Sequence, residues 1–389
     1  MHNIKIISTS NLFGIQANPI QIMKMADAFS DTGFNVEIFL PGWKKSMNST
    51  ELSGRYGVKH NFKINFIPNI SIKKKFAIIT FAIGSFFKSL NWDDRAIIIT
   101  RNERVAAFLV RAGKKVIYEN HTFYYPSEDI TLKYRQRVKA LMKNKNVCMI
   151  TISKRLKELW VNDGLNSDKI FVAHDGVDLA EFTRIAKFKK KELRKKLGLP
   201  LEKEIICYAG SLSKGRGIEF ILDAATFYKN KNYLFLIIGG INSEINKYKN
   251  KLTSNNVIFT GYIENSKVPS YLRCADLLVM PYQRKVVTID GCSPMKVFEY
   301  LASGNYILAP VFPSFYEVMK DFEGITFYEP ENKRKFIYEI ENILQNPNAL
   351  KFHDRFDKLN MYSWQTRASK LLNIYFQFFK LDLPRYFGY

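Results

Sequence analysis

The sequence has few of the residues that build disulfide-bonded or zinc-binding proteins. Its 389 residues include four cysteines, none of them in the C-x-x-C spacing of a metal or redox site: Cys148, Cys207, Cys274 and Cys292. Three of them stand in or beside apolar runs, where a free cysteine packs as a small hydrophobic residue. We therefore expect the reducing environment of the cytoplasm and no zinc site.

The chain also lacks a long uncharged apolar run. The longest such run covers residues 76–87, between Lys75 and Lys88. As a helix it would be roughly 18 Å long, short of the ~30 Å hydrocarbon core of a bilayer. Residues 1–7 lack the charged segment and the apolar stretch of a signal peptide. We expect a protein that neither crosses a membrane nor carries a secretory leader.

Acidic residues are scarce relative to basic ones. There are 59 Lys and Arg against 36 Asp and Glu, which gives a formal net charge of +23. Such a charge attracts anions, including nucleic acids, anionic lipids and phosphorylated small molecules. The basic residues are spread out rather than interleaved with aromatic residues in one stripe, and no nucleic-acid recognition module is evident. We therefore expect no nucleic-acid partner.

What the sequence does contain is a repeated pattern of short apolar runs separated by amphipathic stretches. Continuous apolar strands that alternate with helices predict a parallel sheet covered on both faces, an α/β fold. The pattern occurs in two series, and the length also favours two domains. The runs cover residues 4–8, 36–40, 64–67, 96–100, 116–119, 147–152 and 170–173, then 205–209, 234–238, 257–260, 277–280, 306–309 and 326–328.

The two series predict two doubly wound, Rossmann-like domains that face each other across a cleft. Residues 183–197 carry eight Lys or Arg and few large apolar side chains, which is typical of a solvated connector or a short helix. We place the boundary there, so that the domains cover residues 1–182 and 183–362. The last amphipathic helix, residues 363–380, is expected to pack back on the first domain.

A glycine-rich turn between a strand and a helix is the first candidate for binding chemistry. It runs from Gly210 and Ser211 through Lys214 to Arg216. Glycines let the backbone approach a ligand, and the helix start offers free N–H groups and a positive dipole end. With two cations beside them, these features suit a diphosphate. A tight turn with exposed basic residues is the alternative.

A second helix start follows in residues 290–304. Ser293 is a good N-cap and Pro294 a good first helical residue, followed by Met295. Lys296 and Glu299, at positions i and i+3, share one face of this helix. Lys296 would lie near phosphate oxygens and Glu299 on ribose hydroxyls; a surface salt bridge is the alternative.

These segments resemble family 4 of the retaining glycosyltransferases, which have the GT-B fold. The resemblance covers nearly the whole chain, and it depends on the order and spacing of several motifs. They are Gly-Ser-Leu-x-x-Gly-Arg-Gly-Ile at 210–218, Ser-Pro-x-Lys-x-Phe-Glu-Tyr-x-Ala-x-Gly at 293–304, Phe-Thr-Gly-Tyr-Ile at 259–263, Ala-Asp-Leu-Leu-Val-Met-Pro-Tyr at 275–282, His-Asp-Gly-Val-Asp at 174–178 and the glycine-containing loop at 9–14.

The resemblance implies a role for each matching residue. Arg216 and Lys296 would hold the diphosphate of a nucleotide-sugar donor, and His121 would face the transferred sugar. Glu299 would bind the ribose, and the backbone near Tyr262 and Ile263 would read the base. The other donor-binding residues would be Gly14, Gly210, Ser211, Lys214, Asp290, Ser293, Pro294 and Met295. For His121, the alternative is a structural histidine held by hydrogen bonds.

Two positions depart from the family pattern. Gly291 replaces a glutamate that holds the donor sugar in many members, and Asp290 or the backbone of residues 291–293 would substitute for it. Ser211 replaces the usual arginine after the first glycine of the phosphate loop. Arg216 would then act alone or with Lys214.

The implied activity is transfer of a sugar, with retention, to a glycan or lipid-linked acceptor in bacterial surface polysaccharide synthesis. Cations and helix starts would stabilise the departing nucleoside diphosphate. No Asp-x-Asp triplet occurs in the sequence, so we expect no metal and no cofactor. A nucleotide-sugar epimerase of the same fold and a non-catalytic partner subunit are the alternatives.

Basic and apolar residues stand side by side in two segments, which suits the surface of an anionic membrane. Lys73, Lys74 and Lys75 precede the apolar run 76–87, for which a buried core helix is the alternative. A second helical stretch carries Lys133, Arg135, Arg137, Lys139, Lys143 and Lys145. We expect peripheral association with the cytosolic face of the plasma membrane.

Overall fold

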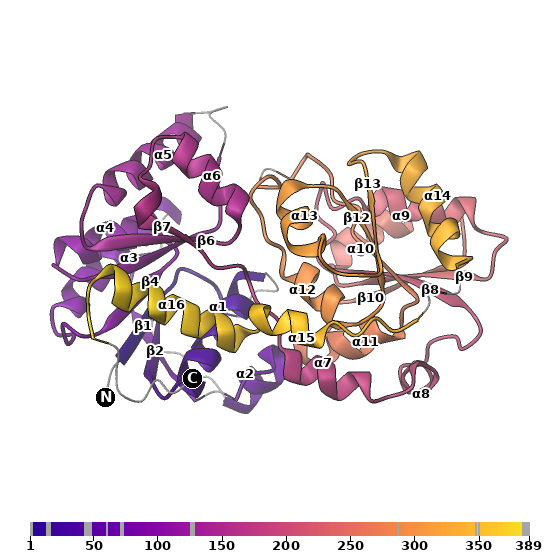
Figure 1. Ribbon diagram of the computed structural model, residues 1–389, viewed down its shortest axis with the longest axis horizontal. Helices are drawn as coiled ribbons and strands as arrows, with labels where there is room; N and C mark the ends of the chain where they lie inside the picture. Colours follow the sequence, from indigo (N-terminus) through magenta and orange to yellow (C-terminus); the bar gives the residue numbers. More distant parts are fainter. Residues whose placement is uncertain are drawn as a thin grey trace. The chain divides into compact units, whose positions relative to one another are not determined.

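The chain folds as two compact units, each built on its own parallel sheet (Figure 1). The first unit comprises Met1–Asp175 with Trp364–Tyr389, and the second comprises Gly176–Ser363. The computed structural model describes residues 3–12, 17–42, 49–59, 61–70, 74–124, 129–286, 288–346, 348 and 351–382.

The first sheet has, within the described residues, seven parallel strands in the order β3-β2-β1-β4-β5-β6-β7. Its strands are β1 (Asn3–Ile7), β2 (Asn35–Pro41), β3 (Lys63–Ile67), β4 (Ile97–Thr100), β5 (Val116–Asn120), β6 (Val147–Thr151) and β7 (Ile170–Val172). Its helices are α1 (Ala17–Asp31), α2 (Ser49–Tyr56), α3 (Lys74–Ser89), α4 (Glu103–Arg111), α5 (Asp129–Met142), α6 (Lys154–Asn162) and α16 (Trp364–Phe378).

The second sheet has six parallel strands among the described residues, in the order β10-β9-β8-β11-β12-β13. They are β8 (Glu204–Ala209), β9 (Tyr233–Ile238), β10 (Val257–Gly261), β11 (Leu277–Val279), β12 (Tyr306–Pro310) and β13 (Ile325–Tyr328). The helices are α7 (Leu179–Ala186), α8 (Lys190–Lys196), α9 (Ile218–Phe227), α10 (Asn242–Lys249), α11 (Val268–Cys274), α12 (Met295–Ala302), α13 (Pro313–Met319), α14 (Lys333–Leu344) and α15 (Phe356–Leu359).

The central strands explain why the sequence pattern predicts this fold. Every residue of β4, β5, β6 and β9 is buried, because helices cover both faces of each sheet. Such strands appear in the sequence as unbroken apolar runs rather than as alternating patterns. The predicted α/β class with two doubly wound sheets is confirmed.

The division between the units falls at Asp175 and Gly176, seven residues before the boundary expected from charge. Helix α7 packs against α11, and Phe182 and Ile185 belong to the core of the second unit. The basic segment after it also belongs to this unit, because Leu193 of α8 is buried in the same core. Of the two alternatives expected from the sequence, a connector or a short helix, the structure has the helix.

The C-terminal helix α16 belongs to the first unit, where it packs against α1. Leu371, Leu372 and Tyr375 are buried along its inner face. Its first turn also brings the buried Arg367 to the end of the first sheet. Among the described helices, none is long and apolar enough to span a bilayer.

Candidate active site

The loop between β8 and α9 in the second unit depends on its glycines. Gly217 forms the N-cap of α9 with a left-handed φ of +74°, and a Cβ there would lie 1.7 Å from the carbonyl oxygen of Pro281. At Gly210, φ is +146° and a Cβ would lie 2.5 Å from Nζ of Lys296. Gly217 therefore lets the loop pass close to Pro281, and Gly210 leaves room for the side chain of Lys296 beside the loop.

Lys296, in the first turn of α12, is buried to 9% exposure. Its Nζ lies 4.0 Å from the ring centroid of Tyr208 and 4.9 Å from that of Tyr282. Nζ makes no hydrogen bond to the described residues. Burial lowers the pKa of Lys296 well below its usual value, and the positive charge of Arg216 lowers it further.

Arg216 lies on the same tyrosine ring as Lys296. Its guanidinium carbon is 4.5 Å from the ring centroid of Tyr282, so the side chains of Arg216 and Lys296 both make cation–π contacts with this ring. The two predicted phosphate-binding residues thus converge, although 80 residues separate them in the sequence. Glu299, partly buried on the next turn of α12, acts favourably on the charge of Lys296.

The start of α12 differs from the prediction. The helix begins at Met295, and Pro294 occupies the N-cap position with φ −66° and ψ 130°. Ser293 is therefore one residue too far out to cap the helix. Its hydroxyl is buried and has no hydrogen-bond partner among the described residues. The hydroxyl of Ser293 and the ammonium of Lys296 are two buried polar groups without partners, which is typical of a site that expects a ligand.

The remaining predicted donor residues lie at the same edge of the second sheet or outside the described part. At Gly239, an added Cβ would lie 2.4 Å from the carbonyl oxygen of Gly210. The N–H of Gly239 donates to the carbonyl of Gly261 at 2.9 Å. Tyr262, directly after Gly261, is 46% exposed. Ser211 and Lys214 are exposed, and Ile263 packs on the core. Asp290 is partly buried and Gly291 is buried. Gly14 lies outside the described residues.

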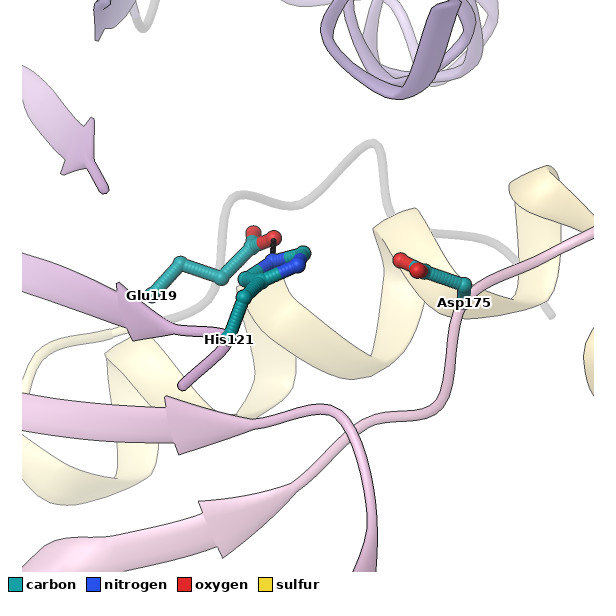
Figure 2. Close-up of side chains that lie close together, drawn as sticks. All are labelled: Glu119, His121 and Asp175. Carbon is teal, nitrogen blue, oxygen red and sulfur yellow. Dashed lines mark hydrogen bonds and ion pairs between the residues drawn. The ribbon is translucent and has the colours of Figure 1, made fainter. Parts of the chain in front are cut away.

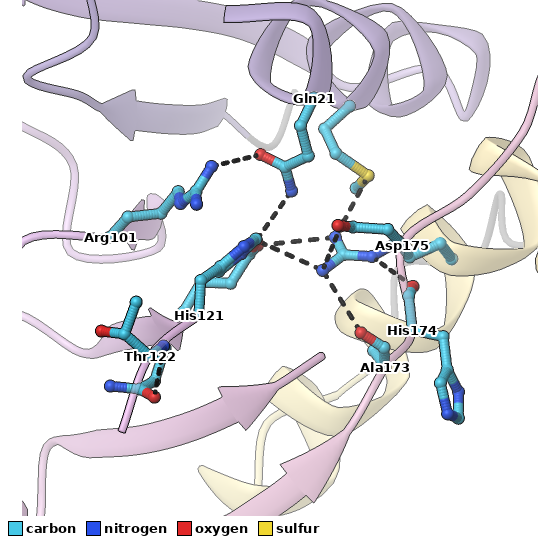
Figure 3. A network of polar contacts seen from close by, with 11 residues as sticks. Gln21, Arg101, His121, Thr122, Ala173, His174 and Asp175 are labelled. Carbon is cyan, nitrogen blue, oxygen red and sulfur yellow. Dashed lines mark hydrogen bonds and ion pairs between the residues drawn. The ribbon is translucent and has the colours of Figure 1, made fainter. Parts of the chain in front are cut away.

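In the first unit, polar side chains gather where β4, β5 and β7 end (Figures 2 and 3). Glu119, the fourth residue of β5, is 3% exposed, and one of its carboxylate oxygens is hydrogen-bonded to Nε2 of His121. Gln21 of α1 donates its Nε2 hydrogen to Glu119 at 2.7 Å. Arg101, after β4, donates to Gln21 at 3.4 Å. His121 is thus held in a polar network from three parts of the unit.

Arg367 supplies the main positive charge to this network. Its guanidinium lies 3.3 Å from Glu119 and 4.0 Å from Asp175. Burial alone would raise the pKa of Glu119, but Arg367 and His121 hold it far below its usual value. Burial and the nearby Arg101 lower the pKa of His121, which favours the neutral imidazole.

Glu119, His121 and Asp175 each offer one ligand atom, and these atoms lie within 4.8 Å of one another (Figure 2). Three such ligands form a common metal-binding set. Here Arg367 lies between the two carboxylates and already provides the balancing charge. A divalent ion would have to displace a guanidinium that is 3% exposed.

Sequence analysis assigned no role to four members of this network: Gln21, Arg101, Asp175 and Arg367. Asp175 and Arg367 stand 54 and 246 residues after His121. The strand-end position of Asp175 was a usable signal, since the carboxyl ends of parallel strands meet at one edge. Arg367 carried no signal, because its helix reaches the first sheet only through the tertiary fold.

Comparison with known proteins identifies the family. Residues 189–359 match the sequence model of "Glycosyl transferases group 1", and residues 20–181 match that of "Glycosyltransferase Family 4". The chain belongs to the family 4 glycosyltransferases. The two matches lie almost wholly within the second and the first unit of this glycosyltransferase, respectively. Residues 1–19, with β1 and the start of α1, and the C-terminal helix α16 lie outside them.

Relatives with known sequence match parts of this glycosyltransferase. An uncharacterized 41.2 kDa protein of the cps region of Klebsiella pneumoniae is 26% identical over 201 residues, 47% of this chain and 53% of the relative. The putative colanic acid biosynthesis glycosyl transferase WcaI of Escherichia coli is 24% identical over 202 residues, 51% and 49% of the two chains. The chain spans about half the length of these curated relatives.

Solved structures share the whole fold. The Anabaena protein Alr3699/HepE in complex with UDP superimposes with a TM-score of 0.72 and 13% identity, over 95% of this chain and 98% of that one. This likeness confirms that the glycosyltransferase has the GT-B fold.

Proposed function

We propose that this glycosyltransferase moves a sugar from a nucleoside-diphosphate sugar to a glycan or lipid-linked acceptor, with retention and without a metal ion. The observation that carries the proposal is the convergence of Arg216 and Lys296 on the ring of Tyr282. A buried ammonium without hydrogen bonds is costly to keep. A diphosphate would supply both the opposite charge and the missing acceptors.

The chemistry follows from where negative charge develops. Breaking the glycosidic bond leaves a nucleoside diphosphate, and its growing charge would be stabilised by the two cations and by the N-terminal end of α9. For retention we propose front-face attack, in which the departing phosphate accepts the proton of the acceptor hydroxyl. Both oxygens of Glu119 accept hydrogen bonds, from Gln21 and Arg367, which does not suit it to act as a covalent nucleophile.

The relatives support the choice of substrates. The Anabaena structure of the same fold contains UDP, so uridine diphosphate sugars are the first donors to test. The Escherichia coli relative is named for colanic acid biosynthesis, and the Klebsiella relative is encoded in a cps region. Bacterial surface polysaccharide synthesis is therefore the proposed setting, with a growing glycan or its lipid-linked precursor as acceptor.

The first test is a transfer assay in the presence of a chelator. Because Arg216 and Lys296 would supply the charge that a metal ion supplies in other transferases, wild-type enzyme with a panel of UDP-sugars should transfer label to acceptor at the same rate with and without excess EDTA. The product linkage, read by NMR, should keep the configuration of the donor. Loss of activity in EDTA with recovery in Mn²⁺ or Mg²⁺ would contradict metal independence. Epimerised sugar in the absence of any acceptor would favour the epimerase.

Helix α3 supports the proposed association with an anionic membrane. Its inner face packs against α4 and buries Phe81 and Ala82, whereas Phe76, Ile83 and Phe87 are 59%, 38% and 63% exposed. These three lie at i, i+7 and i+11, on one side of the helix. Among the basic residues of the second helical stretch, Arg135 and Lys139 pair with Asp163, and Arg137 pairs with Glu103. Lys133 on α5, and Lys143 and Lys145 after its end, would be the ones that face lipid.

A vesicle sedimentation assay tests this association. At low salt the protein should pellet with phosphatidylglycerol vesicles and be released at high salt, because surface charge attraction is screened. The double variant Phe76→Ser/Phe87→Ser should bind less, since it loses apolar area that would enter the interface. The matched control is Phe227→Ser, which removes a 68% exposed phenylalanine from the second unit. Equal binding to neutral phosphatidylcholine vesicles, or equal binding by both sets of variants, would contradict the proposal.

A further inference from the structure

Arg367 is held in one orientation by the backbone that leaves β7. Its Nε donates to the carbonyl of His174 at 2.7 Å, and one terminal nitrogen donates to the carbonyl of Ala173 at 3.4 Å. The side chain is 3% exposed. With the guanidinium plane fixed in this way, its terminal nitrogens lie 3.3 Å and 3.5 Å from the two carboxylate oxygens of Glu119.

Glu119 in turn determines the hydrogen on His121. Its Oε1 accepts a hydrogen bond from Gln21, forms an ion pair with one terminal nitrogen of Arg367 and contacts Nε2 of His121. Its Oε2 accepts a hydrogen bond from the other terminal nitrogen of Arg367. An ionised carboxylate accepts hydrogen bonds and cannot donate them. Nε2 of His121 must therefore carry the hydrogen. In the neutral imidazole, Nδ1 is then left as an acceptor.

A second acceptor faces His121. The carboxylate of Asp175 is directed toward the imidazole ring across a gap (Figure 2). Its Oδ1 is buried and has no hydrogen-bond partner among the described residues, although the charge of Arg367 lies 4.0 Å away. Nδ1 of His121 and Oδ1 of Asp175 are thus two neighbouring acceptors, which suit a ligand with hydrogen-bond donors. Hydroxyl groups of a sugar have that chemistry.

We propose that Arg367, acting through Glu119, is a positioning residue that holds His121 as a neutral imidazole with its hydrogen on Nε2, so that Nδ1 accepts a hydrogen bond from a substrate hydroxyl. This inference rests on the proposed transferase function and deepens it. The C-terminal helix is then part of the catalytic apparatus of the first unit and more than a structural cover. His121 acts on the sugar as an acceptor rather than as an acid.

The charged groups around His121 make this arrangement sensitive to pH. Glu119 and Asp175 favour the imidazolium, Arg101 disfavours it, and burial disfavours it most. Protonation would turn Nδ1 from an acceptor into a donor. Activity should therefore fall as the pH falls through the pKa of His121, which gives the acid limb of the pH profile.

Two variants should move this acid limb in opposite directions. In Glu119→Gln, the amide oxygen takes the position of Oε1, where three donors meet. Because the negative charge is lost, the pKa of His121 falls, and the acid limb moves to lower pH. In Arg367→Met, Glu119 loses its cation and holds a proton on His121 more firmly, so the limb moves to higher pH. Each shift should be about one pH unit. Both variants should also lower kcat at neutral pH by about tenfold or more.

The controls remove the same charges elsewhere in the first unit. Glu103→Gln neutralises another buried glutamate, whose carboxylate pairs with Arg137 at 2.8 Å. Lys370→Met removes an exposed cation from the same helix, three residues after Arg367. Both should keep the wild-type acid limb. A purely structural role for the network would lower the rate in Glu119→Gln and Arg367→Met without moving their limbs, and that result would overturn the inference.

A direct observation of the imidazole covers the case in which a variant fails to fold. In ¹⁵N-histidine NMR of the wild-type protein, the signals missing from His121→Gln identify His121. The inference requires a hydrogen on Nε2 and none on Nδ1 at neutral pH; a hydrogen on Nδ1 would overturn it. Nucleoside diphosphate binding in the second unit should be unchanged in Glu119→Gln and Arg367→Met. If the wild-type enzyme neither bound a nucleoside diphosphate nor transferred sugar, the proposed function itself would fail instead.

Discussion

Arg216→Met should lower kcat by about 10²–10³-fold and leave the folded protein intact, because removing one group that stabilises developing negative charge costs about 3–4 kcal/mol in the transition state. The guanidinium is partly buried on Tyr282, and methionine retains most of that apolar contact. The charge is what the variant loses. The assay is steady-state release of nucleoside diphosphate in the presence of acceptor.

A matched control separates charge at the site from stacking in general. Arg273 lies on Phe352 at 4.5 Å from the ring centroid, the same distance as Arg216 on Tyr282. Arg273→Met should therefore keep wild-type turnover. The kcat of Arg216→Lys should lie between those of wild type and Arg216→Met, because lysine keeps the charge but lacks the planar guanidinium that binds two phosphate oxygens. Equal rates in Arg216→Met and Arg273→Met would remove Arg216 from the site.

Lys296→Met should abolish turnover and yet make the ligand-free protein more stable. Lys296 is 9% exposed, and its buried ammonium makes no hydrogen bond to the described residues and is repelled by Arg216. Methionine would keep the packing on Tyr208 without a buried charge. Replacing a poorly compensated buried ion by an apolar side chain stabilises a protein by about 1–4 kcal/mol. The measurement is denaturant unfolding of both proteins, with a transfer assay beside it.

The stability difference should also depend on pH. The folded pKa of Lys296 lies below its unfolded value, so the unfolded chain binds the extra proton. Wild-type stability therefore gains from this group as the pH rises from the depressed folded pKa toward about 10.5, and the gain is complete above that value. Lys296→Met lacks this contribution, so its advantage should shrink as the pH rises. A variant that is less stable than wild type at every pH would contradict the account of a strained cation.

The fold could be predicted from the sequence because of how parallel sheets are built. Strands buried on both faces need unbroken apolar runs, and residues 116–119 and 234–238 lie within β5 and β9 for that reason. The domain division was harder, since many charges on α8 conceal the buried Leu193. Local polarity indicated a connector or a short helix, and the structure has the helix, α8, one face of which is buried in the core.

The candidate site could be predicted only where local geometry decides it. Helical spacing places Lys296 and Glu299 on one face of α12, and glycines allow the loop at Gly210 to approach it. The cap at Ser293 was wrong, because Pro294 extends the chain by one residue before the helix begins. The contact of Arg367 with Glu119 joins residues 248 positions apart, and no sequence period encodes such a contact.

The most direct test of the central claim is calorimetric titration of UDP and UMP, in EDTA, into wild type, Arg273→Met and the double variant Arg216→Met/Lys296→Met. If the two cations hold the diphosphate, UDP should bind wild type and Arg273→Met about tenfold or more tightly than UMP, and the double variant should lose this preference. A double variant that binds UDP as tightly as the wild-type protein would contradict the claim.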